Sequence, residues 1–189
     1  MTLFGLAVHG VLYVAWSGEN NYSFIGAVRT SAQLVSYELT LSTSFLAVTL
    51  LQHSLNYSQI QTLFEWAPLS GLLSFVFPIF AISAIAEAAR VPFDLPEAES
   101  EIVAGFITEL SAVPFVLYFL AEYSSLVLLA TLSSLLFYSL DCEVGTLISL
   151  TLAVLARAVL PRLRYDQLIT LGWLILLPIS TSFILLILV

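Results

Sequence analysis

Long apolar stretches recur along this chain, and only short polar segments separate them. The hydrocarbon core of a bilayer is about 30 Å thick, and a helix needs about 20 apolar residues to cross it. Of the 189 residues, 60% are hydrophobic and only 10% are charged, and the mean hydropathy is +1.03. Soluble domains carry far more charge than this. We therefore predict an all-α, polytopic membrane helix bundle.

The apolar stretches predict about six spans in a single membrane domain that covers residues 1–189. The expected spans are residues 1–16, 31–52, 66–86, 107–140, 145–160 and 168–189. At about 1.5 Å per residue, the ~34 residues of the fourth stretch would reach ~50 Å as one helix. Tilting alone does not absorb that length. This stretch is therefore either one long tilted helix that projects beyond the membrane or two spans.

The basic residues decide between these two arrangements. The chain has no lysine, and its five arginines are Arg29, Arg90, Arg157, Arg162 and Arg164. With one long helix, the polar loops that hold them all lie on one side of the membrane. Two spans would move the last three to the opposite side. Because arginine and lysine gather on the inner side of membranes, we expect one long helix, with all the arginines on the inner side.

An acidic loop, residues 87–106, follows the third expected span and contains the sequence "ARVPFDLPEAESEIVAGF". Its "DLPE" segment is typical of a helix start, because Asp94 can cap the helix and Glu97 sits at the N3 position of a capping box. We expect a short amphipathic helix there, at the inner membrane interface, which also carries Glu99 and Glu101. These acids form either a solvated loop or a surface that faces a soluble partner or an internal polar cavity.

Further carboxylates fall within or at the ends of the expected spans: Glu38, Glu87, Glu109 and Glu122. A carboxylate in the bilayer costs about 3 kcal/mol on insertion scales, so such side chains face protein or water. Burial favours the neutral form of a carboxyl group, which makes proton exchange near neutral pH possible. These residues therefore indicate a proton or ion path, and the alternative is a structural hydrogen bond between helices.

The motif "LPRLRYDQLI", residues 160–169, is a second dense polar segment on the expected inner side. Its Arg162 and Arg164 either reach toward lipid headgroups or form ion pairs with acids of the same face. The sequence has no His and Cys cluster with metal spacing and no glycine-rich phosphate loop, so we expect neither a metal nor a nucleotide site on this chain. The net charge of −8 argues against nucleic-acid binding.

Several stretches of this sequence resemble the NADH–ubiquinone oxidoreductase chain 1 family, the first membrane subunit of respiratory complex I. They are, in chain order, "FIGAVRTSAQLVSYELTL", "AEAARVPFDLPEAESEIVAGF", "PFVLYFLAEYSSL" and "PRLRYDQL". The family pattern in the second stretch is approximately AETNR-x-PFDL-x-E-x-ESELV-x-GF, so "AEAAR" lacks two polar side chains beside Glu87. Family members also have N-terminal helices ahead of the matching part. We expect either a fragment or, preferably, a split subunit whose front helices are on a separate chain.

The resemblance implies a subunit of the proton-pumping NADH:ubiquinone oxidoreductase that forms part of the quinone tunnel and docks the peripheral arm to the membrane arm. Ubiquinone would be the substrate, while NADH, FMN and iron–sulfur clusters would be bound by partner subunits and no redox cofactor by this chain. The implied partners are the hydrophilic subunits of the quinone site, small neighbouring membrane subunits and the lipid bilayer. The implied location is the mitochondrial inner membrane, with the acidic loop and the arginines on the matrix side. The bacterial plasma membrane is the alternative.

The resemblance also implies roles for individual residues. The expected quinone cavity and acidic loop comprise Arg29, Arg90, Asp94, Glu97, Glu99, Glu101, Phe119 and Tyr123. The expected proton path comprises Glu38, Glu87, Glu109 and Glu122. Ion pairing on the inner face is expected of Arg162, Arg164 and Asp166. None of these residues is expected to be catalytic or to bind a metal.

Three alternatives stay open. The first is the related membrane subunit of an energy-converting hydrogenase, whose acidic loop is similar in character but whose partners differ. The second is a secondary ion transporter that uses Glu38 and Glu122. Such transporters commonly contain paired internal repeats, and the sequence has none. The third is a structural anchor whose acids serve only for docking.

Overall fold

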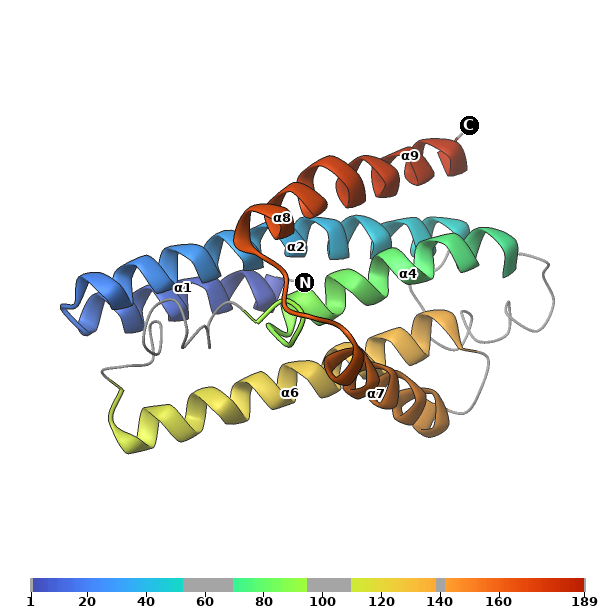
Figure 1. Ribbon diagram of the computed structural model, residues 1–189. Helices are drawn as coiled ribbons and strands as arrows, with labels where there is room; N and C mark the ends of the chain where they lie inside the picture. The colour runs from blue at the N-terminus through green and yellow to red at the C-terminus, as the bar shows by residue number, and fades with distance from the viewer. Residues whose placement is uncertain (1, 53–69, 95–109, 139–141, 189) are drawn as a thin grey trace.

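The computed structural model describes residues 2–52, 70–94, 110–138 and 142–188, and Figure 1 shows their arrangement. Within these ranges the elements are α1 (Thr2–Ser17), α2 (Asn21–Gln52), α4 (Ser70–Glu87), α6 (Ala112–Phe137), α7 (Cys142–Val159), α8 (Tyr165–Thr170), the π-helix η2 (Leu171–Leu176) and α9 (Leu177–Leu188). The described residues contain no strand, so the all-α prediction is confirmed. The amphipathic helix expected in the acidic loop lies outside the described residues.

The helices have the length and composition of membrane spans. Those long and apolar enough to cross a membrane are Asn21–Leu51, Ala112–Phe137, Cys142–Val159 and Tyr165–Leu188, and shorter apolar helices are Gly5–Ser17 and Phe75–Glu87. Large apolar side chains of α6 and α7 are exposed around much of each helix. Helices that are apolar on all sides are typical of a membrane-embedded bundle. The predicted polytopic bundle is therefore confirmed.

The helix α2 starts earlier than the sequence predicted. It begins at Asn21, so Arg29 lies inside the helix and not, as expected, in a preceding loop. The first turns of α2 pack against α1, where Ala27 and Leu34 share a core cluster with Val8. This packing stabilises the helical conformation of the polar residues at the start of α2, whose composition alone favours a loop.

The helix α6 is shorter than the expected span of residues 107–140. It begins at Ala112, after Ser111 in an extended conformation, and has 26 residues. At 1.5 Å per residue its length is about 39 Å. A tilt of about 40°, at the upper end of the usual range, would fit that length to the hydrocarbon core. The described helix therefore projects less far beyond the membrane than the expected helix would.

The central helix of the bundle is α2, against which α1, α4 and α9 all pack (Figure 1). The largest core cluster joins Leu41 and Val48 of α2 to Val76 and Phe80 of α4, and also reaches Leu129 of α6. Burial of these side chains fixes α4 along α2. As a result, the C-terminal end of α4 lies against the same helix that carries Glu38.

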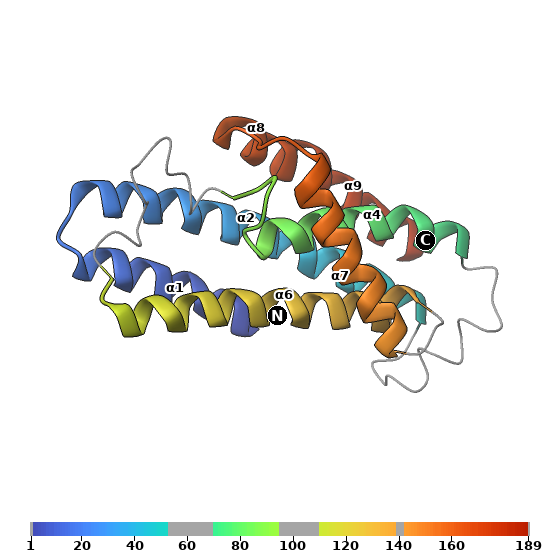
Figure 2. The ribbon, with the colours of Figure 1, turned by 60° about the horizontal axis from the view of Figure 1, so that its bottom comes forward.

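The helices α6 and α7 approach closely where α7 begins. A Cβ atom at Gly145 would lie 2.8 Å from the Cβ atom of Ser134, closer than side chains tolerate. From this contact α7 runs back across the bundle toward the start of α8 (Figure 2). The chain is thereby returned to the region where α4 ends.

Candidate functional site

The chain leaves α4 at Glu87 through a tight turn, residues 88–94, which we call the 88–94 turn. The N–H of Arg90 donates to the carbonyl of Ile85 at 3.4 Å, and the N–H of Phe93 donates to the carbonyl of Arg90 at 2.7 Å. Ala89 has a φ of 50°, in the left-handed region where many helices end. The helix therefore stops at a defined point, and the turn brings Arg90 to α6.

Arg90 forms a buried ion pair with Glu122 near the middle of α6. The Arg90 Nε lies 3.1 Å from the Glu122 Oε1, and the two side chains are only 10% and 8% exposed. The Arg90 guanidinium carbon also lies 4.2 Å from the ring centroid of Tyr123, a cation–π distance. Burying one charge alone would be costly, and the opposite charge and the aromatic face offset that cost.

Two further acids, Glu87 and Glu38, lie near this ion pair. Glu87, the last residue of α4, is buried, and its Oε2 has no hydrogen-bond partner among the described residues. Glu38 of α2 is close enough for its negative charge to act on Glu87. The Glu38 carboxylate also lies against α1, because a Cβ atom at Gly5 would be 3.1 Å from its Oε1. Two carboxylates that repel each other in a buried site are a suitable place for a proton to bind and leave.

The segment between α7 and α8 closes over the 88–94 turn. The Arg162 guanidinium lies 3.8 Å from the Asp94 carboxylate and also donates to the Asp94 carbonyl. The backbone N–H of Leu163 donates to the carbonyl of Pro92 at 3.0 Å. Arg162 thus pairs with Asp94 of the acidic loop, which is one of the two arrangements that the sequence allowed.

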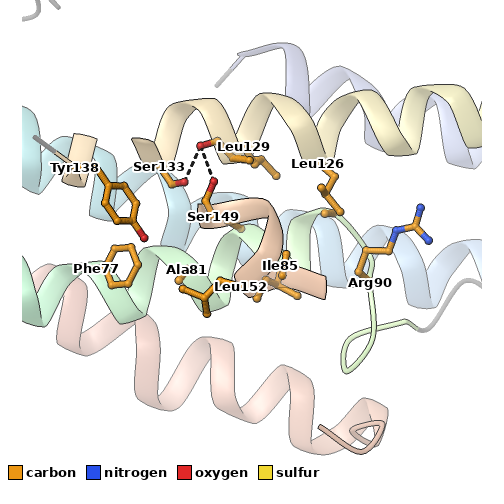
Figure 3. A pocket seen from close by; sticks show the side chains of 14 residues that line it. Phe77, Ala81, Ile85, Arg90, Leu126, Leu129, Ser133, Tyr138, Ser149 and Leu152 are labelled. Carbon is orange, nitrogen blue, oxygen red and sulfur yellow. Dashed lines mark hydrogen bonds between the residues drawn. The ribbon is translucent and has the colours of Figure 1, made fainter. Parts of the chain in front are cut away.

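An apolar cavity of about 70 Å³ lies between α4, α6 and α7 (Figure 3). The row of side chains around it runs from Tyr138 at one end to Arg90 at the other. The hydroxyls of Ser133 and Ser149 both donate to the Ala130 carbonyl, at 2.8 and 3.1 Å, so their protons are already used within the protein. Burial raises the pKa of the Tyr138 phenol. The cavity suits an apolar group and not a charged one.

The structure brings some of the predicted site residues together and separates others. Arg90, Glu122 and Tyr123 are in contact, and Glu87 and Glu38 are close to each other. Phe119 packs on other rings of α6, with its centroid 4.8 Å from that of Phe115. The remaining predicted residues fall into three groups. Arg29 lies over the ring of Tyr165 at 5.8 Å, Arg164 pairs with Asp166 at 3.9 Å on an exposed surface, and Glu97, Glu99, Glu101 and Glu109 lie outside the described residues.

Sequence reasoning missed buried polar side chains of α2 that contact this region. Gln33 donates to the carbonyl of Ala86 in the last turn of α4 and to the carbonyl of Phe93 in the 88–94 turn. The Tyr37 hydroxyl donates to the carbonyl of Leu168 at 2.9 Å. Both residues are fully buried. They are four positions apart, so they share one face of the helix. An amide and a phenol on one face of an apolar span, next to Glu38, was the signal that could have found them.

Among the described residues, no group of three or more His, Cys, Asp or Glu side chains could hold a metal ion. The charged groups buried in this part of the chain consist instead of one arginine and its neighbouring acids. Such an arrangement can hold and move protons, and it can respond to a change of charge nearby.

The NADH dehydrogenase family model matches residues 1–188 of this chain. The chain is 41% identical over 211 aligned residues to NADH-ubiquinone oxidoreductase chain 1 of Mycosarcoma maydis, covering 99% of this chain and 62% of that protein. It is 39% identical over 184 residues to the protein of the same name from Hyaloraphidium curvatum, covering 97% of this chain and 61% of that protein.

A bacterial relative is similar to nearly the same extent. The chain is 37% identical over 210 residues to an NADH-quinone oxidoreductase subunit of Rickettsia bellii strain OSU 85-389, covering 99% of this chain and 61% of that protein. The chain therefore spans about three fifths of the length of these curated relatives.

Proposed function

The chain belongs to the NADH dehydrogenase family, and from this premise we propose that it is a membrane subunit of a proton-pumping NADH:quinone oxidoreductase. The observation that carries the proposal is the family match, which runs through nearly the whole chain. The names of its fungal and bacterial relatives describe oxidoreductases that act on NADH and a quinone. NADH, FMN and iron–sulfur clusters would belong to partner subunits, and ubiquinone would be the substrate that meets this chain.

In this proposal α6 and the 88–94 turn form part of the wall of the quinone tunnel. Tyr123 is 55% exposed on α6 and carries Arg90 on its ring face, and Phe119 lies one turn away. An aromatic and apolar wall suits the quinone ring and its tail, while the adjacent charges suit a head group that gains electrons and then needs protons. The positive charge of Arg90 favours negative charge that develops on the quinone.

The buried acids would form the start of a proton path. Glu122 lies beside Arg90, Glu87 is buried at the end of α4, and the half-buried Glu38 of α2 lies against α1. A proton taken from one of these carboxyl groups leaves a negative charge that shifts the protonation of its neighbours. This supports the passing of a signal from the quinone site into the membrane arm. The resemblance places Glu109 on the same path.

The acidic loop would dock the peripheral arm. Arg162 anchors the described part of the loop at Asp94. The later acids of the loop, Glu97, Glu99 and Glu101, would meet the hydrophilic subunits. This proposal places the acidic loop and the arginines on the matrix side of the mitochondrial inner membrane, in line with the fungal relatives. The bacterial plasma membrane is the alternative, in line with the Rickettsia relatives.

The experiment that tests this function is a native separation of the complex. Native membranes are extracted in a mild detergent, resolved on a native gel, stained for NADH oxidation, and analysed by peptide mass spectrometry. We expect this chain in the NADH-oxidising band, together with hydrophilic subunits that bind FMN and iron–sulfur clusters. Finding the chain alone, or only in a small complex that does not oxidise NADH, would contradict the proposal. Those results would favour the transporter and the membrane subunit of a hydrogenase, respectively.

A further inference from the structure

Gln33 joins α2 to both ends of the 88–94 turn. Its side-chain Nε2 donates to the carbonyl of Ala86 at 2.8 Å and to the carbonyl of Phe93 at 2.8 Å. The residue is fully buried, so water does not compete for either bond. One side chain therefore fixes the point where the helix α4 ends and the point where the turn is completed.

The orientation of this amide follows from its partners. A backbone carbonyl can only accept hydrogen bonds, so only the NH₂ group of Gln33 can lie between two of them. Both of its N–H donors are then used. A glutamate carboxylate at this position would be repelled by both carbonyls, and a methionine would have no donor to offer them. The NH₂ group of glutamine therefore matches the two carbonyls by its chemistry and not through size alone, while the Gln33 Oε1 has no hydrogen-bond partner among the described residues.

We propose that Gln33 is a positioning residue of the quinone-reducing complex, because it sets the place at which Arg90 meets Glu122. This inference rests on the proposed function. Arg90 lies between Ala86 and Phe93 in the chain, and its own carbonyl accepts the N–H of Phe93. With both ends held, the guanidinium reaches Glu122 and Tyr123 at the observed distances.

The position of Arg90 then depends on α2, which also carries Glu38. Without the Gln33 donors, the Phe93 carbonyl loses this hydrogen bond, while the Ala86 carbonyl keeps the N–H of Ala89 at 3.3 Å. The turn can replace the lost bonds only by opening toward water. A displacement of about 1 Å at a charged group that contacts the substrate region can reduce turnover by orders of magnitude. Gln33 acts on the quinone site through Arg90 and touches no substrate itself.

The test uses Gln33→Met and Gln33→Glu in the assembled complex in its native membrane. Both replacements are good helix formers of similar length, so α2 is preserved. The matched control is Thr40→Ala, because Thr40 is also fully buried on α2 but its hydroxyl donates only to its own helix, at the Tyr37 carbonyl. Three quantities are measured: hydrogen exchange of the peptide that covers the 88–94 turn, NADH-driven quinone reduction, and NADH oxidation by a soluble electron acceptor.

We expect exchange in the turn to accelerate by at least about tenfold in Gln33→Met, which loses both donors. The acceleration should be smaller in Gln33→Glu, because a buried neutral carboxyl group keeps one O–H donor. Quinone turnover should fall by about tenfold or more, while the amount of complex and its NADH oxidation by the soluble acceptor stay unchanged. Thr40→Ala should alter none of these quantities.

Two results would overturn the positioning role. One is exchange that stays slow in both variants, or that rises while quinone turnover stays normal. The other is a parallel loss of complex, of quinone reduction and of oxidation by the soluble acceptor, which would make Gln33 a stability residue only. Failure of the proposed function is recognised separately, in the unmodified complex. If that complex does not reduce quinone with NADH, the proposed function is overturned as well.

Discussion

Arg90 and Glu122 form a buried ion pair that joins the end of α4 to the middle of α6, with the Arg90 Nε 3.1 Å from the Glu122 Oε1. The pair exists because the 88–94 turn redirects the chain after Glu87, and Tyr123 covers the cation. Arg90 therefore connects an acid of α6 to the part of the chain that Gln33 holds on α2. A substitution at Gln33 should therefore change the position of Arg90 relative to Glu122, and a substitution at Glu122 should change the position of the 88–94 turn.

Replacing Glu122 by glutamine should leave assembly of the complex intact and reduce its activity. In Glu122→Gln the side chain keeps its shape and a carbonyl oxygen beside the Arg90 Nε, so the complex should assemble. The negative charge is lost, and quinone reduction or the proton pumping coupled to it should fall by about tenfold or more. Native-gel abundance and NADH-driven quinone reduction measure the two effects.

The matched control for this prediction is Glu143→Gln. Glu143 is exposed in the first turn of α7, so its neutralisation should leave both assembly and activity unchanged. Normal quinone reduction and pumping in Glu122→Gln would support the view that this chain is only an anchor.

The ring of Tyr123 should stabilise the charged form of Arg90. In Tyr123→Leu the cation–π contact is lost, which should cost about 0.5–2 kcal/mol at this partly buried site. Tyr123→Phe keeps an aromatic face and should retain most of the stability. The thermal midpoint of the detergent-solubilised complex distinguishes them, and equal midpoints for the two variants would show that the ring face contributes nothing.

The contact at Gly145 should not accept a side chain. In Gly145→Ala the new methyl group meets Ser134 at 2.8 Å, so α6 and α7 must separate, and overpacking of this kind costs about 1–3 kcal/mol. Gly10→Ala is the control, because nothing lies within 4 Å of a Cβ atom there. That change should be neutral or stabilising by about 0.5–1 kcal/mol, as for other helical glycines. Thermal unfolding that ranks the two variants in the reverse order would contradict the packing argument.

Of the two arginines in the residue 160–169 motif, Arg162 should contribute more than Arg164 to the stability of the 88–94 turn. Arg162 binds both the carboxylate and the carbonyl of Asp94, whereas Arg164 pairs with Asp166 on an exposed surface. Arg162→Ala should therefore loosen the 88–94 turn, at a cost of about 1.5–3 kcal/mol for a charge-assisted bond. Arg164→Ala should cost about 0–1 kcal/mol. Hydrogen exchange of the turn is the measurement, and equal exchange in the two variants would contradict this difference.

The sequence was sufficient to find the acids but not their partners. Glu122 stands out because it interrupts an apolar run, and a bilayer penalises an unpaired carboxylate there. Its partner Arg90 is distant in the chain and reaches it only through the left-handed turn at Ala89. No periodicity in the sequence encodes that geometry. Gln33 was missed for the same reason, because its importance lies in two backbone carbonyls, and these have no sequence signature.

The fold was predictable where composition decides and less so where packing decides. Apolar runs located the helices and their number closely enough to predict a membrane bundle. The start of α2 was wrong because Ala27 and Leu34 pack on α1 and extend the helix through polar residues. The length of α6 was overestimated because hydropathy continues past the point where Ser111 leaves the helical conformation.

The π-helix η2 determines how the last span meets α2. The buried residues of this span are Leu168, Gly172, Leu176 and Ser180, a repeat of four. In an α-helix four residues overshoot a full turn by about 40°, so such a repeat would wind away from its neighbour. A π-type turn takes more residues per turn and reduces the overshoot. Buried residues spaced four apart can thus keep facing α2, where a Cβ atom at Gly172 would lie 3.7 Å from the ring of Tyr37.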